Sequence, residues 1–329
     1  INLDGASRAD IRTVLAAVWE QHAALRSVVR DRHLYLRTLA EAELPLTEHV
    51  AADPAALDDL LRSTADEDHR MLDLTDGPLA RFAIIRAGNR TRLLIVAHHL
   101  VVDGVTWSIL SSDIVDGVRA LQQGSSLSLP RATASLTEWA TALERHMERR
   151  PAAERRYWDD VDREAAATAP VFPSSSGRQT HELTEIVDGL SPAALAADAS
   201  AGYGANMEDV LLTALGRALH DLTGNAENSI QLEHHGRIEH PELPSIDRTA
   251  GWFTNMFPIV LQSHVSDRES LVAMKDRLRA VPDRGLAHMY WNAGATKPRS
   301  SVTFNYMGDL GEASPSSFAS SWRSPSGTA

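Results

Sequence analysis

The sequence of 329 residues contains no cysteine. Disulfide bonds, thiolate metal sites and a cysteine nucleophile are therefore excluded, and the redox compartment stays open. The sequence also lacks an apolar run long enough to span a bilayer, and its start does not resemble a signal peptide, so we expect a cytoplasmic location and no membrane partner. Positive charge is scarce, because 32 Lys and Arg face 44 Asp and Glu for a net charge of -12. This balance argues against nucleic acid as a partner, since phosphates are bound by basic surfaces.

What is present fits a globular protein with sizeable cores: 43% of the residues are hydrophobic and 23% are charged. Hydrophobic periodicity alternates between helical and extended patterns, which predicts an α/β fold in two lobes. Helices are expected from Ser191 and at residues 7–28, 55–65, 106–121, 136–149, 152–161 and 208–222. Strands are expected from Ile230 and at residues 79–86, 91–97, 182–187, 250–261 and 301–308. The short turn-type linker 87–90 predicts that the strands on either side of it pair antiparallel.

A hinge is predicted at residues 170–177, which contain two prolines, three serines and a glycine. It divides the chain into an N-terminal lobe, residues 1–170, and a C-terminal lobe, residues 171–329. Both lobes are expected to be incomplete at the outer end, because residues 1–5 resemble the middle of a domain. Residues 312–329 are rich in Ser, Pro and Gly, which predicts a disordered tail.

The clearest chemical signal is the segment 98–104, with the sequence HHLVVDG. It follows the apolar strand 91–97 and precedes the helix 106–121, so we expect both histidines where a buried strand ends. A strand end is a rigid mount for a catalytic group, and histidine exchanges protons near neutral pH.

Three further extended segments carry polar or aromatic residues. The first, 230–237 (IQLEHHGR), would present Glu233 at a strand end, facing the cleft between the lobes. In the second, 250–261, the aromatic side chains of Trp252, Phe253 and Phe257 are expected in the core. In the third, 301–308, Asn305 and Tyr306 taken alone fit a turn residue and a core phenol as well as they fit a site.

At these motifs the chain resembles the epimerization domains of nonribosomal peptide synthetases. They are a branch of the condensation-domain superfamily, which shares the two-lobed fold of chloramphenicol acetyltransferase. The segment 98–104 matches the superfamily pattern HHxxxDG at every fixed position. Residues 233–237 (EHHGR), 251–254 (GWFT) and 304–308 (FNYMG) are similar to the EGHGRE, GWFT and FNYLG strings of the branch. The resemblance runs from near residue 1 to about residue 311.

The chain departs from the branch at several positions. His234 replaces a glycine of the glutamate string and Ile238 replaces its final glutamate. Ser108 stands where the branch often carries arginine, and residues 282–285 begin a PxxGxGYG string that the following residues abandon. The LPLTPIQ-type opening and the segment after FNYLG are absent, so the expected fold is truncated at both ends.

The resemblance implies a cofactor-independent isomerase of antibiotic or other secondary metabolism. It would interconvert the L and D configurations at the α-carbon of an aminoacyl or peptidyl thioester, which a peptidyl carrier protein holds on its phosphopantetheine arm. Other synthetase modules would be further partners. A base must remove the α-proton, and a second group must return it to the opposite face. His99 and Glu233 would meet this demand in the interlobe cleft, with Tyr306 as an alternative donor.

The residues expected to support the site are His98, Asp103, Gly104, Arg237 and Asn305. Adjacent side chains diverge along a strand, so His98 is interpreted as a structural hydrogen-bonding residue, and the same divergence argues against a metal site. Buried carboxylates are usually paired, which indicates an ion pair or a loop brace for Asp103. Arg237 would pair with Asp103 or brace Glu233.

Two other functions stay open. A condensation domain, which joins two carrier-bound substrates through an amide, would use His99 without needing Glu233 or the pair Asn305 and Tyr306. A noncatalytic docking module or a truncated remnant would explain the missing terminal segments. The intact candidate site residues argue against the remnant.

Overall fold

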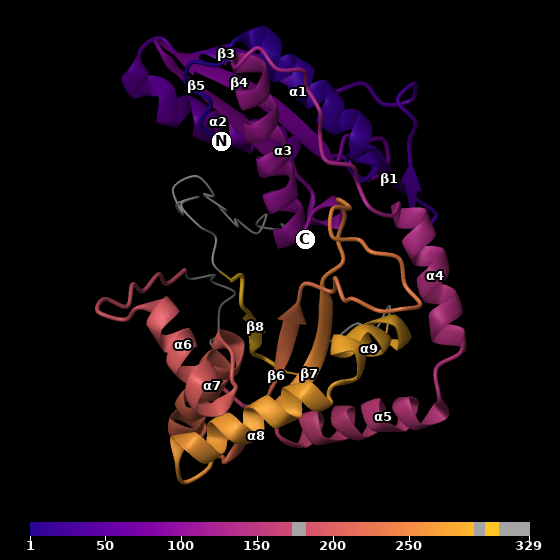
Figure 1. Cartoon of the computed structure of the whole chain (residues 1–329), viewed down its shortest axis with the longest axis vertical. Helices are drawn as coiled ribbons and strands as arrows, with labels where there is room; N and C mark the ends of the chain where they lie inside the picture. Colours follow the sequence, from indigo (N-terminus) through magenta and orange to yellow (C-terminus); the bar gives the residue numbers. More distant parts are fainter. Residues whose placement is uncertain (173–181, 293–299, 309–329) are drawn as a thin grey trace. The chain divides into compact units, whose positions relative to one another are not determined.

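A computed structural model describes residues 1–172, 182–292 and 300–308 (Figure 1). The described chain forms two compact units, each assembled from separate stretches of sequence. The first unit contains Ile1–Leu143, Glu239–Phe253 and residues 307–308, and the second contains Glu144–Ile238 and Thr254–Tyr306. This division differs from the single boundary at residue 170 expected from the sequence. One reason is that Trp158 packs edge-on against Phe257, with ring centroids 5.9 Å apart, which ties the helix before the expected hinge to the second unit.

The first unit is built around a three-stranded sheet in the order β3-β4-β5 (Figure 1). Its strands are β3 (Leu46–Val50), β4 (Ala80–Ala87) and β5 (Arg90–Ala97). β3 lies parallel to β4, and β4 pairs antiparallel with β5 through the turn that the sequence predicts. The expected strands at 79–86 and 91–97 and their antiparallel pairing are therefore confirmed.

β4 is buried on both faces, because its side chains alternate between two cores. Phe82 and Ile84 pack in the core formed with α1 (Arg8–Gln21) and α3 (Gly104–Gln122), which lie side by side. Ala83 and Ile85 pack in the core formed with α2 (Leu57–Arg70). Since full burial of one such large side chain contributes about 1.5–3 kcal/mol, the two cores fix β4 and the hairpin that ends at the histidines.

The remaining elements of this part of the chain are short. They are η1 (Ala23–Arg26), β1 (Ser27–Arg30), β2 (His33–Leu36), η2 (Pro54–Ala56), η3 (His99–Val101) and α4 (Leu136–Glu148). The helix expected at 7–28 is wrong at its end, since α1 stops at Gln21 and Val28 pairs with Tyr35 in an antiparallel hairpin. The break falls at His22, whose imidazole is buried against Asp113 at 2.9 Å. This tertiary contact overrides the helical periodicity.

The second unit contains a sheet in the order β7-β6-β8. β6 (Glu227–His234) pairs antiparallel with β7 (Asn255–Gln262) and parallel with β8 (Thr303–Asn305). Four helices pack against these strands: α5 (Ala152–Ala167), α7 (Met207–Thr223), α8 (Asp267–Ala280) and α9 (Leu286–Trp291). The unit also includes α6 (Pro192–Tyr203) and η4 (Pro282–Gly285). The helix expected from Ser191 is confirmed, with Ser191 as its N-cap.

Several expected boundaries need correction. Residues 182–187 form no strand, and Leu183 and Ile186 are 84% and 80% exposed, so their alternation served no core. The strand expected at 250–261 begins only at Asn255, because the preceding residues pack in the first unit. Most of the expected hinge and all of the expected tail at 312–329 lie outside the described residues. Among the described helices, none has both the length and the apolar character needed to cross a membrane.

Candidate active site

The HHLVVDG segment forms the connection between β5 and α3, as the sequence predicts. β5 ends at Ala97, and the amide of His98 donates to the carbonyl of Leu79 at 2.8 Å, which extends the hairpin by one bond. A 3-10 turn then carries the chain to Asp103, and Gly104 is the first residue of α3. Both histidines therefore lie directly after a strand that is fixed by two cores.

His98 faces its own backbone. Its Nδ1 accepts a hydrogen bond from the amide of Leu100 at 3.2 Å and caps the 3-10 turn. Burial lowers the pKa of His98, and the neighbouring His99 lowers it further, so the ring is neutral near pH 7. This contact gives His98 a structural task.

His99 points toward an aromatic neighbour from a distant part of the sequence. Its imidazole meets the indole of Trp252 nearly at right angles, with ring centroids 5.9 Å apart and an interplanar angle of 77°. Trp252 was expected in the core, yet it is 41% exposed, whereas Phe253 and Phe257 are buried as predicted. The correction has a physical reason: the segment before β7 turns its tryptophan toward His99.

Asp103 braces the loop through both of its oxygens. Oδ1 accepts from the amide of Thr106 at 2.7 Å and caps α3, and Oδ2 accepts from the amide of Phe253 at 3.1 Å. Asp103 is only 2% exposed, so these bonds compensate for burying a carboxylate. The loop that carries His99 is thereby tied to the residue that follows Trp252.

In the second unit, Glu233 lies on β6, directly opposite Asn305 on β8. The amide Nδ2 of Asn305 donates to Oε1 of Glu233 at 3.0 Å. Two strings that are 72 residues apart are thus joined by one bond between neighbouring strands. A neutral donor orients the carboxylate and leaves its charge in place.

The residues after Glu233 form a tight polar turn. Nδ1 of His234 accepts from the amide of Gly236 at 3.3 Å, and Nδ1 of His235 accepts from the amide of Arg237 at 3.1 Å. Their rings are stacked with centroids 4.1 Å apart. Burial, the neighbouring His235 and Arg284 lower the pKa of His234 to about 3.

These three histidines are poorly suited to hold a metal ion. His98, His234 and His235 each use Nδ1 to accept a backbone amide, which places the proton of a neutral ring on Nε2. A protonated nitrogen has no lone pair for a cation. The arrangement of donors therefore does not favour a metal at these pairs.

Two expected roles remain predictions. Arg237 is buried and belongs to the second unit, whereas Asp103 belongs to the first. Tyr306 follows β8 and is 39% exposed. The structure thus joins His99 with Asp103 in one unit and Glu233 with Asn305 in the other.

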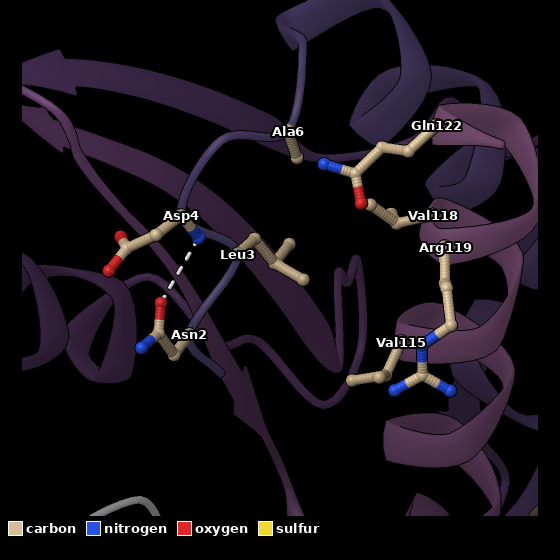
Figure 2. A pocket seen from close by; sticks show the side chains of 8 residues that line it. All are labelled: Asn2, Leu3, Asp4, Ala6, Val115, Val118, Arg119 and Gln122. Atoms are coloured by element: carbon tan, nitrogen blue, oxygen red, sulfur yellow. Dashed lines mark hydrogen bonds between the residues drawn. The ribbon is translucent and has the colours of Figure 1, made fainter.

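A shallow hollow of about 300 Å³ lies elsewhere in the first unit (Figure 2). It is lined by Asn2, Leu3, Asp4, Ala6, Val115, Val118, Arg119 and Gln122. Arg119 is 15 residues along α3 from Gly104, which corresponds to roughly 22 Å at 1.5 Å per residue. The hollow therefore belongs to the far end of α3 and not to the histidine loop.

Comparison with known proteins identifies the family. The family model of the condensation domain matches residues 5–319, and the chain belongs to this family. A polypeptide of linear gramicidin synthase from Brevibacillus parabrevis is 32% identical over 318 residues, which cover 90% of this chain and 6% of that protein. Surfactin synthase subunit 1 of Bacillus subtilis (strain 168) is 32% identical over 339 residues, which cover 96% of this chain and 9% of that protein. The chain thus spans only a small part of these relatives.

Solved structures confirm the predicted chloramphenicol acetyltransferase-like fold of the superfamily. The epimerization domain from the third module of tyrocidine synthetase B superposes with a TM-score of 0.74 at 25% identity, covering 94% of this chain and 76% of that one. The first condensation domain of the calcium-dependent antibiotic synthetase superposes with a TM-score of 0.67 at 16% identity, covering 95% and 76%. The second likeness shows the fold alone.

Proposed function

We propose that the chain is an epimerization domain of a nonribosomal peptide synthetase. It would invert the α-carbon of an aminoacyl or peptidyl thioester that a carrier protein holds on its phosphopantetheine arm. The observation that carries the proposal is the bond between Asn305 and Glu233. It links the two strings that distinguish this branch from condensation domains. The likeness to the epimerization domain of tyrocidine synthetase B, at 25% identity, supports the same assignment.

The chemistry requires two proton-handling groups. One removes the α-proton of the thioester, which leaves an enolate, and the other returns a proton to the opposite face of the carbon. We assign this pair to the imidazole of His99 and the carboxylate of Glu233, with Tyr306 as the alternative donor. The thioester itself acidifies the α-proton, so no intrinsic cofactor enters the reaction. Each positioned group would contribute about 10²–10⁴ in rate.

Condensation is the second candidate. The matching family model is named for the condensation domain, and the first condensation domain of the calcium-dependent antibiotic synthetase shares the fold. In that reaction His99 would assist the amine that attacks a second carrier-bound thioester. Glu233 and Asn305 would then have no chemical role.

Chiral analysis of the thioester product decides between the candidates. The chain is incubated with a carrier protein that bears an L-phenylalanyl phosphopantetheine thioester, with and without a second carrier loaded with an acceptor amino acid. A mixture of L and D phenylalanine after cleavage supports epimerization. A new amide without D product supports condensation, and unchanged L-phenylalanine in both samples contradicts both reactions for this substrate.

A further inference from the structure

Three buried polar residues at α3 hold the segment that carries Trp252. Asp103 caps the helix, and Thr106 and Asp113 follow at spacings of three and seven residues, which places all three on one face. Their exposures are 2%, 0% and 2%. Polar side chains this deeply buried need hydrogen-bond partners.

All three find partners in the segment 248–253. The guanidinium of Arg248 donates to Oδ1 of Asp113. The hydroxyl of Thr106 donates to the carbonyl of Gly251 at 2.9 Å and lies 3.1 Å from the amide of the same residue. Oδ2 of Asp103 accepts from the amide of Phe253. The backbone on both sides of Trp252 is thus fixed to α3.

The close approach at Gly251 requires glycine. A Cβ at this position would lie 2.9 Å from a methyl of Leu136 and 2.9 Å from the ring of Phe253. Thr249 adds a bond from its hydroxyl to the carbonyl of Ala134 at 2.5 Å. The segment therefore has little freedom, although the indole that it carries is 41% exposed.

The indole lies against His99 and stays partly exposed. A histidine ring rotates broadly about its last side-chain torsion, so the backbone of the loop does not by itself aim the imidazole. An edge-to-face aromatic partner at 5.9 Å restricts that rotation. The same partner leaves part of the indole open beside the imidazole.

We propose that Trp252 is a positioning residue for His99. The segment 248–253, fixed to α3 through Asp103, Thr106 and Asp113, holds the indole against the imidazole and sets the direction in which its nitrogen meets the α-proton. The rate consequence rests on the proposed function, whereas the orientation of the ring does not.

Kinetics on the full chain test the rate consequence. The α-hydrogen exchange of an L-phenylalanyl thioester on a carrier protein is followed in D₂O for Trp252→Leu and Trp252→Phe. We expect Trp252→Leu to lower kcat about tenfold, the factor that corresponds to the loss of one aromatic pair, with KM changed less than about twofold. Trp252→Phe should keep most of the rate. Equal rates for the two variants would overturn the proposal.

Thr106 supplies an independent arm, because Thr106→Val removes both bonds to Gly251 and leaves the indole intact. We expect a loss of kcat similar to that of Trp252→Leu, little further loss in the double variant, and rescue in Thr106→Ser. Tyr35→Leu is the matched control, since Tyr35 is 38% exposed in the same unit and lies on β2. Full additivity of the two losses would contradict a shared task.

NMR of the His99 ring separates this proposal from the proposed function. Its ring-proton and nitrogen shifts should move in Trp252→Leu and stay close to the parent in Trp252→Phe, whether or not the chain inverts any substrate. If the parent forms no D product, the proposed function fails while the shifts still decide the positioning. Unchanged shifts in Trp252→Leu would remove Trp252 from the task.

Discussion

Asn305 and Glu233 are register partners on the parallel strands β8 and β6, and the amide of Asn305 donates to the carboxylate across 3.0 Å. The donor is neutral, so it orients Glu233 without cancelling its charge. A hydrogen bond to a charged group contributes about 1.5–3 kcal/mol. β8 has only three residues in the sheet, and Asn305 is the last of them. The short strand therefore delivers this amide to the carboxylate.

Glu233→Gln should stop inversion and keep the fold. The glutamine carbonyl still accepts from Asn305, so the contact between the strands survives, but the side chain no longer exchanges a proton. We expect no D product above background in chiral chromatography of the cleaved thioester. The melting temperature should match that of the parent. D product at the parental rate would refute a proton-transfer role for Glu233.

Asn305→Ala should weaken the reaction without stopping it. Removal of the donor leaves Glu233 charged and less well oriented, and the lost bond corresponds to a rate about 10- to 100-fold lower. Thr303→Ala is the control, because Thr303 is an exposed residue of the same strand, opposite Gln231. Equal rates for the two variants would show that the bond to Glu233 does not contribute.

His99→Ala should abolish deuterium washout from the α-carbon of a carrier-bound aminoacyl thioester. His98→Ala should retain washout and lose about 1 kcal/mol of stability, because it removes one neutral hydrogen bond to the amide of Leu100. Washout by mass spectrometry and unfolding in urea measure the two effects separately. Undiminished washout in His99→Ala would exclude this imidazole from the mechanism.

The sequence predicts the elements that have a single clear periodicity. β4, β5 and α3 follow from alternation, a turn signal and helical spacing, and the histidine loop between them follows from their order. Local patterns fail where distant contacts decide. The helix that ends at Gln21 is stopped by the buried contact of His22 with Asp113, and no local signal marks that contact.

The site shows the same division. HHLVVDG and the glutamate string are readable because their residue types are unusual after apolar strands. The exposure of Trp252 is not readable, since an aromatic residue beside Phe253 in an apolar run fits a core equally well. Its position depends on bonds from α3 to Gly251 and Phe253, about 145 residues along the chain. A buried threonine and two buried aspartates near one helix end would have been the only hint.

Asp103→Ala should destabilise the first unit by about 2–4 kcal/mol. The change removes the cap of α3, which contributes about 1 kcal/mol, and leaves the buried amide of Phe253 without this acceptor, which costs about 1–3 kcal/mol. Asp103→Asn should lose less, because its carbonyl can still cap the helix. Ser7→Ala, at the cap of α1, is the control and should cost about 1 kcal/mol. Urea unfolding measures all three, and an equal loss in Asp103→Ala and Ser7→Ala would contradict the double role.

His234 should make the protein less stable in mild acid. Its pKa falls from 6.5 in the unfolded chain to about 3 in the folded protein, because the ring is buried and lies near His235 and Arg284. Between these values the unfolded chain binds a proton that the folded protein does not, so the free energy of unfolding decreases as the pH falls. The expected loss from this group is about 1 kcal/mol between pH 6.5 and 5.5.

The variant His234→Gln isolates this contribution, because glutamine can still accept from the amide of Gly236 and does not titrate. A direct comparison is needed, since burial raises the pKa of Glu208, and that group changes stability in the opposite direction as the pH rises above 4.5. Urea unfolding at pH 6.5 and 5.5 should show a loss about 1 kcal/mol smaller in His234→Gln than in the parent. Equal losses would mean that the imidazole is protonated in the folded protein, and the stacked pair of rings would then hold a charge that its burial opposes.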